Sequence, residues 1–349
     1  MDVIVLAVSF GVILLGAELF TNGIEWFGRK LELAEGAVGS VLAAAGTALP
    51  ETMIPLIAIL FGGGVESSHI GVGAILGAPF MLSTLAMFVT GVAVLVVARK
   101  RSTADVMLIK ADVLAHDMRF FAIAYALAVG VAFVPSELAW PRWVAAAALL
   151  GIYAYYVREH FVSDSGGNHG ELAALRLHRL DRWAPRGETR PRLRIVSAQV
   201  LVALGCIILG AAMFVGAVEH VATAIGADST LLALLVAPIA TELPEKFNSV
   251  IWVRQGKDTL AMGNITGAMV FQSTIPTVVA LVFASSHWAI SADSTVAFIS
   301  AGIAFASSAV IFIPMARTGR LLGRWLLLGG GFYLAYVALV VASLSGRPA

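Results

Sequence analysis

Long apolar segments follow one another along almost the whole of this 349-residue chain. Each is close to or longer than the ~20 residues that an α-helix needs to cross the hydrocarbon core of a bilayer. The runs are continuous instead of alternating, and an open sheet edge cannot exist in lipid, so strands are not expected. Charged residues make up only 13% of the chain, too few to cover a soluble protein of this size. The sequence therefore predicts an all-α membrane protein with ten transmembrane helices, at 3–28, 36–61, 68–98, 119–135, 140–160, 195–224, 230–253, 258–284, 294–314 and 321–345.

The basic residues set the predicted orientation. With ten spans, all of the 23 Lys and Arg residues fall on one side of the membrane except Arg142, Arg347 and Lys246. Because cytoplasmic loops carry the excess of Lys and Arg, both termini are predicted outside and loop 161–194 in the cytoplasm. This loop, the one sizeable hydrophilic segment, fits a basic amphipathic helix on the anionic inner leaflet, with a regulatory element as the alternative. Compact loops and the lack of targeting signals favour a prokaryotic inner (plasma) membrane.

One motif occurs twice, as GTALPE at 46–51 and as ATELPE at 240–245, each in the middle of an apolar segment. Proline removes a backbone donor and opens a helix, so predicted helices two and seven are expected to be broken. The same internal alignment continues into the next helix and places 73–78 on 263–268. Each half contains five spans, an odd number, so the second half crosses in the opposite sense. The predicted organisation is a five-helix repeat at 1–160, a cytoplasmic basic linker at 161–194 and an inverted five-helix repeat at 195–349.

The two motifs predict a cation site. An acid in mid-membrane is unfavourable unless something positive visits it, and inverted repeats bring the two breaks together near the bilayer centre. Glu51 and Glu245 are therefore expected to face each other and to share either protons or a cation. With oxygens from Thr47 and Thr241, this set suits Ca²⁺ or Na⁺ better than soft metals.

Further polar residues in the spans leave alternatives open. Glu242 adds a third acid, and Lys246 one turn later either neutralises it or leaves it as a ligand or proton carrier. Gln272 and Asn264 either bind the ion or only hydrogen-bond a neighbouring helix. Glu18, Asn22 and Glu25 on one face of the first helix could line an access path, although interfacial solvation is preferred for Glu25. The histidines near membrane edges or in loops are read as interfacial residues: His116, His160, His169, His178, His220 and His287.

The paired motifs, the Gly-x-x-x-Gly-Ala segments of helices three and eight and the five-plus-five arrangement resemble the sodium/calcium exchanger family of the calcium/cation antiporter superfamily. The resemblance covers nearly all of the membrane part. It implies the exchanger fold, alternating access with helices one and six sliding over a rigid core, and ion ligation by Glu51, Glu245, Thr47 and Thr241, with Gln272 in the position of a family ligand. Glycines in the two sliding helices would permit close contact, or would serve ordinary helix packing: Gly11, Gly16, Gly23, Gly205, Gly210 and Gly216.

The sequence also departs from the family pattern. Ala48 and Glu242 stand where the family usually has a serine after the motif threonine. Gly-Ala-Pro at 77–79, followed by Leu82, stands where the family has Gly-Ser-Asn and a further Asn or Asp. Several oxygens expected for Na⁺ are missing and one acid is added, so proton coupling or a different substrate ion is favoured.

These observations predict a secondary antiporter that exports Ca²⁺ or a related cation in exchange for Na⁺ or H⁺. The alternatives are a transport-inactive cation-binding sensor and a cation channel. An enzyme is not expected, because the spans contain no His-Glu-x-x-His motif and no Ser and His dyad. The expected partners are inorganic cations and the lipid bilayer; no cofactor is expected, and a net charge of +1 offers nothing to nucleic acid.

Overall fold

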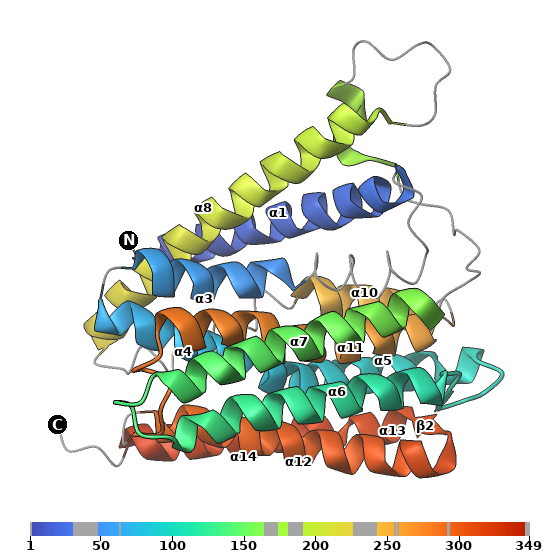
Figure 1. The fold of residues 1–349 in the computed structure, drawn as a ribbon. Helices are drawn as coiled ribbons and strands as arrows, with labels where there is room; N and C mark the ends of the chain where they lie inside the picture. Colours follow the sequence, from blue (N-terminus) through green and yellow to red (C-terminus); the bar gives the residue numbers. More distant parts are fainter. Residues whose placement is uncertain are drawn as a thin grey trace.

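The computed structural model of the chain describes residues 2–30, 48–62, 64–163, 174–180, 191–225, 243–254, 256, 258–291 and 294–345. Within these residues the protein is a bundle of helices with one short pair of strands (Figure 1). The first half contains α1 (Asp2–Lys30), α3 (Leu49–Phe61), α4 (Val65–Met81), the π-helix η2 (Leu82–Ala86), α5 (Met87–Val97), η3 (Ala98–Lys100), β1 (Val106–Met107), α6 (Ala111–Gly130), η4 (Val131–Phe133) and α7 (Trp140–Ser163). The second half contains η5 (Arg176–Leu180), α8 (Leu193–Ile225), α10 (Leu243–Arg254), α11 (Asp258–Phe283), α12 (Thr295–Thr318), β2 (Leu321–Leu322), α13 (Gly323–Leu326) and α14 (Leu328–Ser345).

Six of the described helical segments are long and apolar enough to cross a membrane: Ser67–Lys100, Ala111–Phe133, Leu193–Val218, Ala261–Phe283, Thr295–Thr318 and Gly323–Ala342. Each corresponds to one of the ten predicted spans. Of the other four, 3–28 and 140–160 are helical, and 36–61 and 230–253 are described only from Leu49 and Leu243 onward. The helical class of the protein is confirmed, while the count of ten remains a prediction.

Two local expectations were wrong. Helix α6 begins at Ala111, whereas the predicted span began at 119. Its first two turns are polar but still helical, because Asp117 in the second turn is buried and hydrogen-bonded to residues of other helices. A strand pair, Val106 with Leu322 and Met107 with Leu321, joins two connections where no strand was expected. These connections lie outside the apolar windows, so the rule against open sheet edges in lipid does not apply to them.

Helices α1 and α8 pack against each other as an antiparallel pair on one side of the bundle (Figure 1). Early residues of α1 meet late residues of α8: Ile13 lies against Gly210, Gly16 against Ala203, and Asn22 bonds to Gln199. A Cβ added to Gly16 would lie 2.8 Å from Ile207 Cγ1, and one added to Gly210 would lie 2.7 Å from Ile13 Cγ1. These two glycines are related by the internal alignment, and the close contact expected of them is present.

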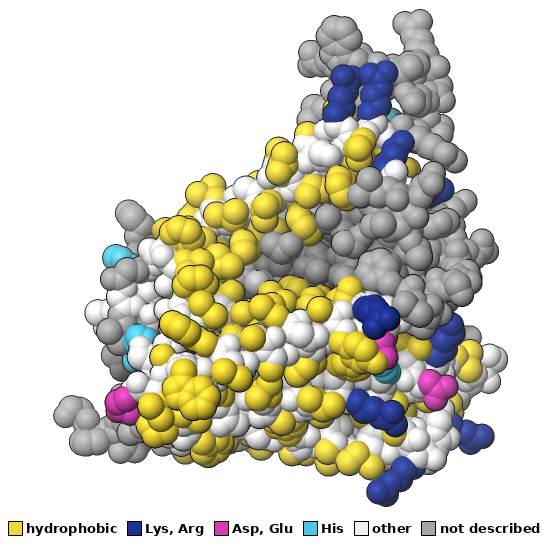
Figure 2. All heavy atoms as spheres, in the orientation of Figure 1, with side chains coloured by type: hydrophobic (Ala, Val, Ile, Leu, Met, Phe, Trp, Pro, Cys, Tyr) yellow, Lys and Arg dark blue, Asp and Glu magenta, His cyan; other side chains and the backbone are white. Residues whose placement is uncertain are grey.

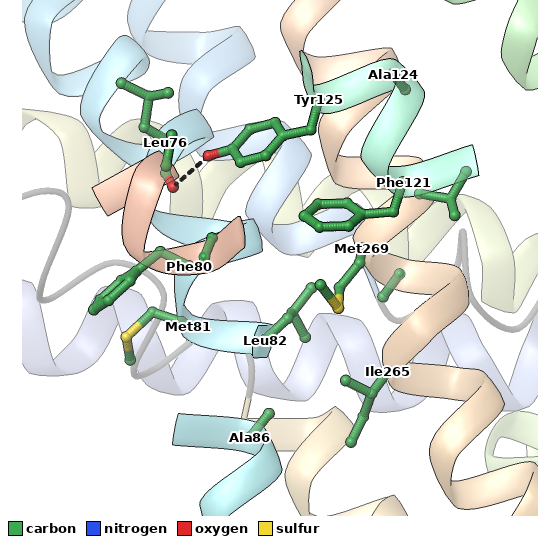
Figure 3. Close-up of a cluster of buried hydrophobic side chains, with 14 of the residues drawn as sticks. Leu76, Phe80, Met81, Leu82, Ala86, Phe121, Ala124, Tyr125, Ile265 and Met269 are labelled. Atoms are coloured by element: carbon green, nitrogen blue, oxygen red, sulfur yellow. Dashed lines mark hydrogen bonds between the residues drawn. The ribbon is translucent and has the colours of Figure 1, made fainter. Parts of the chain in front are cut away.

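Helix α11 occupies the interior. In its apolar window 78% of the residues are buried, against 28–61% in the other five spans. It packs against α6 and α7, and also against α3, α4 and α10. Figure 3 shows the core where α11 meets α4, η2 and α6, with the Tyr125 hydroxyl donating to the Leu76 carbonyl at 3.4 Å. The labelled side chains of that core are Leu76, Phe80, Met81, Leu82, Ala86, Phe121, Ala124, Tyr125, Ile265 and Met269.

The contact between α14 and η2 yields a prediction. A Cβ added to Gly329 would lie 2.4 Å from the carbonyl oxygen of Thr84, a backbone atom that cannot rotate away. We expect Gly329→Ala to destabilise the protein by about 1–3 kcal/mol, as overpacking does. Gly331→Ala is the matched control, because a Cβ there meets nothing within 4 Å and alanine is the better helix former. Thermal unfolding in detergent measures both, and equal midpoints for the two variants would contradict the proposed contact.

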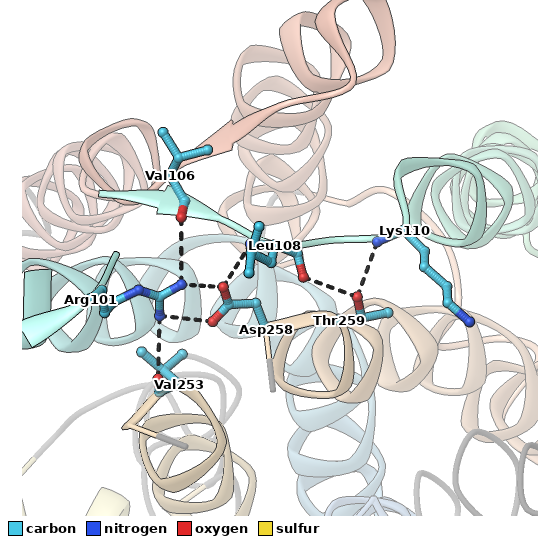
Figure 4. Close-up of polar contacts among 7 residues, drawn as sticks. All are labelled: Arg101, Val106, Leu108, Lys110, Val253, Asp258 and Thr259. Carbon is cyan, nitrogen blue, oxygen red and sulfur yellow. Dashed lines mark hydrogen bonds and ion pairs between the residues drawn. The ribbon is translucent and has the colours of Figure 1, made fainter. Parts of the chain in front are cut away.

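Two arginines act as structural clamps at opposite ends of α11. Arg142 is fully buried and donates to the carbonyls of Trp288, Pro135, Leu138 and Val134, so this exception to the predicted charge asymmetry pairs with backbone and not with solvent. At the other end, Arg101 forms a bidentate ion pair with Asp258 and also donates to Val253 O at 3.2 Å (Figure 4). The backbone N–H of Leu108 donates to the same carboxylate at 2.7 Å. This second clamp joins the connection after α5 to the start of α11.

The surface follows the predicted charge pattern. In Figure 2, Lys and Arg side chains gather towards one end of the bundle, and hydrophobic side chains cover much of the face between the two ends. We refer to the end of the bundle where Lys and Arg gather as the basic end; it includes the Arg101–Asp258 clamp. The protein is an integral membrane protein, and the assignment of the basic end to the cytoplasm remains a prediction.

Candidate metal centre

Two of the six predicted ion ligands, Glu51 and Gln272, have side chains that the structure describes. Thr47, Thr241 and Glu242 lie outside the described residues. Glu245 lies in α10, outside the part of the chain whose side chains are described. The opposition of Glu51 and Glu245 therefore remains a prediction.

Glu51 lies in the first turn of α3, which begins at Leu49 with Pro50 in its opening positions. Proline suits the first helical positions, where its missing N–H would have no intrahelical partner. The Ala48 carbonyl accepts from the backbone N–H of Thr52 at 3.2 Å and from its hydroxyl at 2.9 Å, which closes the first turn. A helix begins where the proline predicted a break. The Glu51 carboxylate, only 5% exposed, thus lies at the positive end of the helix dipole.

Gln272 binds Glu51 directly. Its Nε2 donates to Glu51 Oε2 at 2.9 Å and to the Ala48 carbonyl at 3.2 Å, and its side chain is 1% exposed. Both amide hydrogens are used, so Oε1 is the atom of this side chain that remains able to ligate a cation. Gln272 lies near the midpoint of α11 (Asp258–Phe283), which has the length and composition of a membrane span. Glu51 is therefore held beside the middle of α11.

The position related to Gln272 in the first half is apolar. Leu82 is buried and is the first residue of the π-helix η2. A π-helix was not expected from the sequence. The hydroxyls of Ser83 and Thr84 donate to the Phe80 carbonyl, and Ser307 donates to the Ser83 carbonyl at 2.6 Å. Pro79 in α4 was the available sequence signal, since proline frees a carbonyl from the helical ladder. The site is thus asymmetric, with a polar amide from α11 and none from Leu82.

Two other polar residues that the sequence marked as candidates are also buried, one in α10 and one in α11. Lys246 in α10 is 5% exposed, and Asn264 in α11 is 6% exposed. The side-chain nitrogen of Asn264 has no hydrogen-bond partner among the described residues. The pairing of Lys246 with Glu242 remains a prediction, since Glu242 is outside the described residues.

On the polar face of α1, Asn22 and Glu18 are paired with residues of α8 and of the linker. Asn22 Oδ1 accepts from Gln199 Nε2 and from the backbone N–H of Arg176, both at 3.0 Å, and Asn22 Nδ2 donates to the Ala174 carbonyl. The guanidinium of Arg176 pairs with Glu18 at 2.9 Å. These contacts dock the described part of the linker onto α1 and α8, while its place on the inner leaflet remains a prediction; Glu25 is outside the described side chains.

His160, read from sequence as an interfacial residue, has a buried partner. Its side chain is 12% exposed and its Nε2 lies 3.5 Å from Asp117 Oδ1. Asp117 was not singled out from sequence, because it precedes the predicted start of its span. The sequence does contain a signal for it: an adjacent acid and histidine occur twice, as His116-Asp117 near the start of one helix and as Glu159-His160 near the end of the next.

Three comparisons with known proteins bear on this fold. The family model described as sodium/calcium exchanger protein matches residues 1–158 and 196–344. No curated protein matches the sequence. Among solved structures, the H⁺/Ca²⁺ exchanger CAX aligns with a TM-score of 0.73 at 16% identity, over 99% of this chain and 87% of that one. The sodium-calcium exchanger NCX_Mj, soaked with Na⁺ and Sr²⁺, aligns with a TM-score of 0.59 at 16% identity, over 97% of both chains.

A bundle of apolar helices with a carboxylate buried near mid-depth defines an integral membrane protein with a polar site in its interior. The family match extends over most of the sequence in two long stretches. The chain belongs to the sodium/calcium exchanger family. Its fold is similar to those of the CAX and NCX_Mj exchangers.

Proposed function

We propose that the protein is a secondary antiporter that exchanges Ca²⁺, or a related hard cation, for H⁺ or Na⁺. The observation that carries the proposal is the buried Glu51 carboxylate, held by Gln272 beside the middle of α11. A charged group at this depth in a membrane protein is unfavourable unless it is paired, so a carboxylate there serves a positive ion or a proton. Family membership and the fold shared with two Ca²⁺ exchangers support the same conclusion.

The chemistry of the ligands favours a hard ion. Glu51, Glu245 and the hydroxyl and backbone oxygens of Thr47 and Thr241 are the proposed ligands, with Gln272 Oε1 and Glu242 as further candidates. Carboxylate, carbonyl and hydroxyl oxygens prefer Ca²⁺ and related cations over Zn²⁺ or Cu²⁺, which select nitrogen and sulfur. A group of three or more His, Cys, Asp or Glu side chains placed to hold a metal is not found among the described residues.

Proton coupling is the exchange mode that the residues favour. Leu82 and Ala48 remove oxygens that the family pattern supplies, and Glu242 adds an acid that can carry a proton. Of the two exchangers compared, the H⁺/Ca²⁺ exchanger CAX gives the higher TM-score. We therefore propose that Ca²⁺ enters the site as protons leave its carboxyl groups.

Alternating access is proposed to occur by sliding of the α1–α8 pair over the remaining bundle. The pair packs closely at Gly16 and Gly210, and α8 rests on α3, which carries Glu51. Movement of α8 along α3 would open the site to one side of the membrane and then to the other. Gly11 and Gly205, by contrast, have open space around them and take no part in the contact.

The experiment that tests the function is a gradient-swap flux assay in proteoliposomes. Ca²⁺ uptake is measured with an imposed pH gradient in the complete absence of Na⁺, and again with an imposed Na⁺ gradient at equal pH. Uptake driven by the pH gradient alone is expected. Absence of flux under both gradients would refute antiport, and a Ca²⁺-dependent thermal shift in the same preparation would then identify a sensor. Electrical currents far above carrier turnover would instead identify a channel.

The Gln272–Glu51 contact makes a separate prediction. Gln272→Leu places the side chain of its repeat counterpart at this position and removes a hydrogen bond to a charged group, a bond worth about 1.5–3 kcal/mol. We expect apparent Ca²⁺ affinity to fall by roughly tenfold or more, since about 1.4 kcal/mol is tenfold. Ser273→Ala is the control, because the adjacent buried hydroxyl bonds only within its own helix, to Val270 O. Affinities within twofold of each other for the two variants would contradict the role of Gln272.

A further inference from the structure

A cluster of ionisable side chains lies where α6, α7 and α11 meet, apart from Glu51 and Gln272. Its centre is Asp117 on α6, which is 2% exposed. Oδ1 of Asp117 accepts from the Tyr156 hydroxyl at 3.0 Å and faces His160 Nε2 at 3.5 Å, both on α7. Oδ2 accepts from the Thr266 hydroxyl of α11 at 2.6 Å. One carboxyl group therefore links three helices.

The hydrogen bonds of His160 determine how many protons this pair holds. Its Nδ1 lies 3.3 Å from the Tyr156 carbonyl oxygen, which can only accept, so Nδ1 carries a hydrogen. If Nε2 carried none and Asp117 were ionised, a nitrogen lone pair would face a carboxylate oxygen and the buried pair would have a net charge of −1. One additional proton, on Nε2 or on the carboxyl group, removes both unfavourable features and makes the pair neutral.

A second acid and imidazole pair lies between this centre and the surface. His116 Nε2 is 3.0 Å from Glu159 Oε2, and their side chains are 32% and 37% exposed. The His116 and His160 rings have centroids 5.7 Å apart. The two acid and imidazole pairs are therefore neighbours, and the His116–Glu159 pair is the more exposed of the two.

The other elements packed on Asp117 add little charge. Helix α7 contributes Tyr153, whose ring lies beside that of Tyr156, in addition to the residues already named; Tyr155 and Arg158 of the same helix are exposed. Helix α11 contributes only Asp258, in its first turn and paired with Arg101. Helix α12 contributes only Arg317, in its last turn. The short η4 has no ionisable side chain. The proton of the Asp117–His160 pair is thus held by the groups of the cluster itself.

We propose that Asp117 and His160 form a proton-binding site, separate from the cation site, whose proton keeps α11 seated against α6 and α7. Thr266 and Gln272 lie six positions apart on α11, about 9 Å along the axis and about 120° around it. Loss of the proton leaves a buried negative charge beside α11 and loosens its contact with α6. This proton is not part of the proposed exchange for Ca²⁺, so the site exists whether or not the protein transports Ca²⁺.

The test is the pH dependence of thermal unfolding of the full chain in detergent, without Ca²⁺. The sign follows from the proton count: the folded protein holds a proton that the unfolded chain releases, so stability falls as pH rises. As the pH is raised from about 6 to about 9, we expect the wild-type midpoint to fall by about 2 °C more than that of Asp117→Asn. His160→Gln should lose the same component, and Asp112→Asn, an exposed acid on the same helix, should keep it.

Infrared difference spectra over the same pH range supply a readout that a purely structural role would not change. The wild type should show carboxyl or imidazole bands that Asp117→Asn removes. Midpoint curves that fall in parallel for wild type and both variants, or bands unchanged in Asp117→Asn, would overturn the proposal; if Asp117→Asn does not fold, His160→Gln decides. Neither readout requires transport, so a failed flux assay would refute the antiporter and leave this result intact.

Discussion

Glu51→Gln is expected to abolish cation exchange while leaving the fold intact. The glutamine amide keeps an oxygen that can accept from Gln272 Nε2, which now lies 2.9 Å from the Glu51 carboxylate, so local packing is preserved. The negative charge is lost, however, and direct ligation of a cation by a carboxylate is stronger than a hydrogen bond to a charged group. We expect Ca²⁺ flux and Ca²⁺ affinity each to fall by at least about 100-fold, the equivalent of about 2.7 kcal/mol.

The matched control is Glu18→Gln, which removes an acid from another membrane helix. Glu18 is 61% exposed and pairs with Arg176 at the protein surface, so its loss should change flux by less than about twofold. Flux is measured by isotope uptake into proteoliposomes and binding by calorimetry. Retention of wild-type Ca²⁺ binding in Glu51→Gln, with an unchanged unfolding midpoint, would exclude Glu51 as a ligand.

Asp258→Asn is expected to cause the largest loss of stability. The Asp258 side chain is fully buried, and it neutralises Arg101, whose side chain is 10% exposed (Figure 4). Removing one partner of a buried ion pair leaves the other charge uncompensated, which typically destabilises a protein by about 3–5 kcal/mol. Asp258 is the first residue of α11 and also accepts from the Leu108 N–H. Losing its charge therefore weakens the contacts that hold the start of this central helix in place.

A surface ion pair close to this clamp provides the comparison. Asp105 lies 3.5 Å from Arg324, with side chains 26% and 65% exposed, so Asp105→Asn should change stability by about 0–1 kcal/mol. Replacing both buried partners, with Arg101→Met and Asp258→Leu together, should destabilise less than Asp258→Asn alone because no buried charge remains. Denaturant unfolding in micelles measures all three. Equal effects for Asp258→Asn and Asp105→Asn would show that the clamp does not stabilise the fold.

The sequence predicted the parts of the fold that depend on local pattern. Apolar length identified the spanning helices, and Pro50 identified the point where α3 begins. The family resemblance selected Gln272 as a candidate ligand, and its side chain is in contact with that of Glu51. The internal alignment related Gly16 to Gly210, and both lie in the α1–α8 contact.

The features that the sequence did not predict depend on partners distant in the chain. Asp117 lies just before an apolar segment, and its hydrogen-bond partners, Tyr156 on α7 and Thr266 on α11, are far from it in the sequence. Asn22 was a candidate for an access path, and in the structure it is hydrogen-bonded to the backbone of the linker. In each case a polar side chain is tolerated in the interior because its hydrogen bonds are satisfied by other elements, which hydropathy alone cannot show.

The most direct test of the cation site is an experimental structure of the protein soaked with Sr²⁺, located by its anomalous scattering. We expect a single strong peak near the midpoint of α11. It should lie within direct ligand distance, about 2.3–2.6 Å for an ion of the Ca²⁺ type, of carboxylate oxygens of both Glu51 and Glu245. A peak away from Glu51, or a Glu245 carboxyl group that points into lipid far from Glu51, would contradict this expectation.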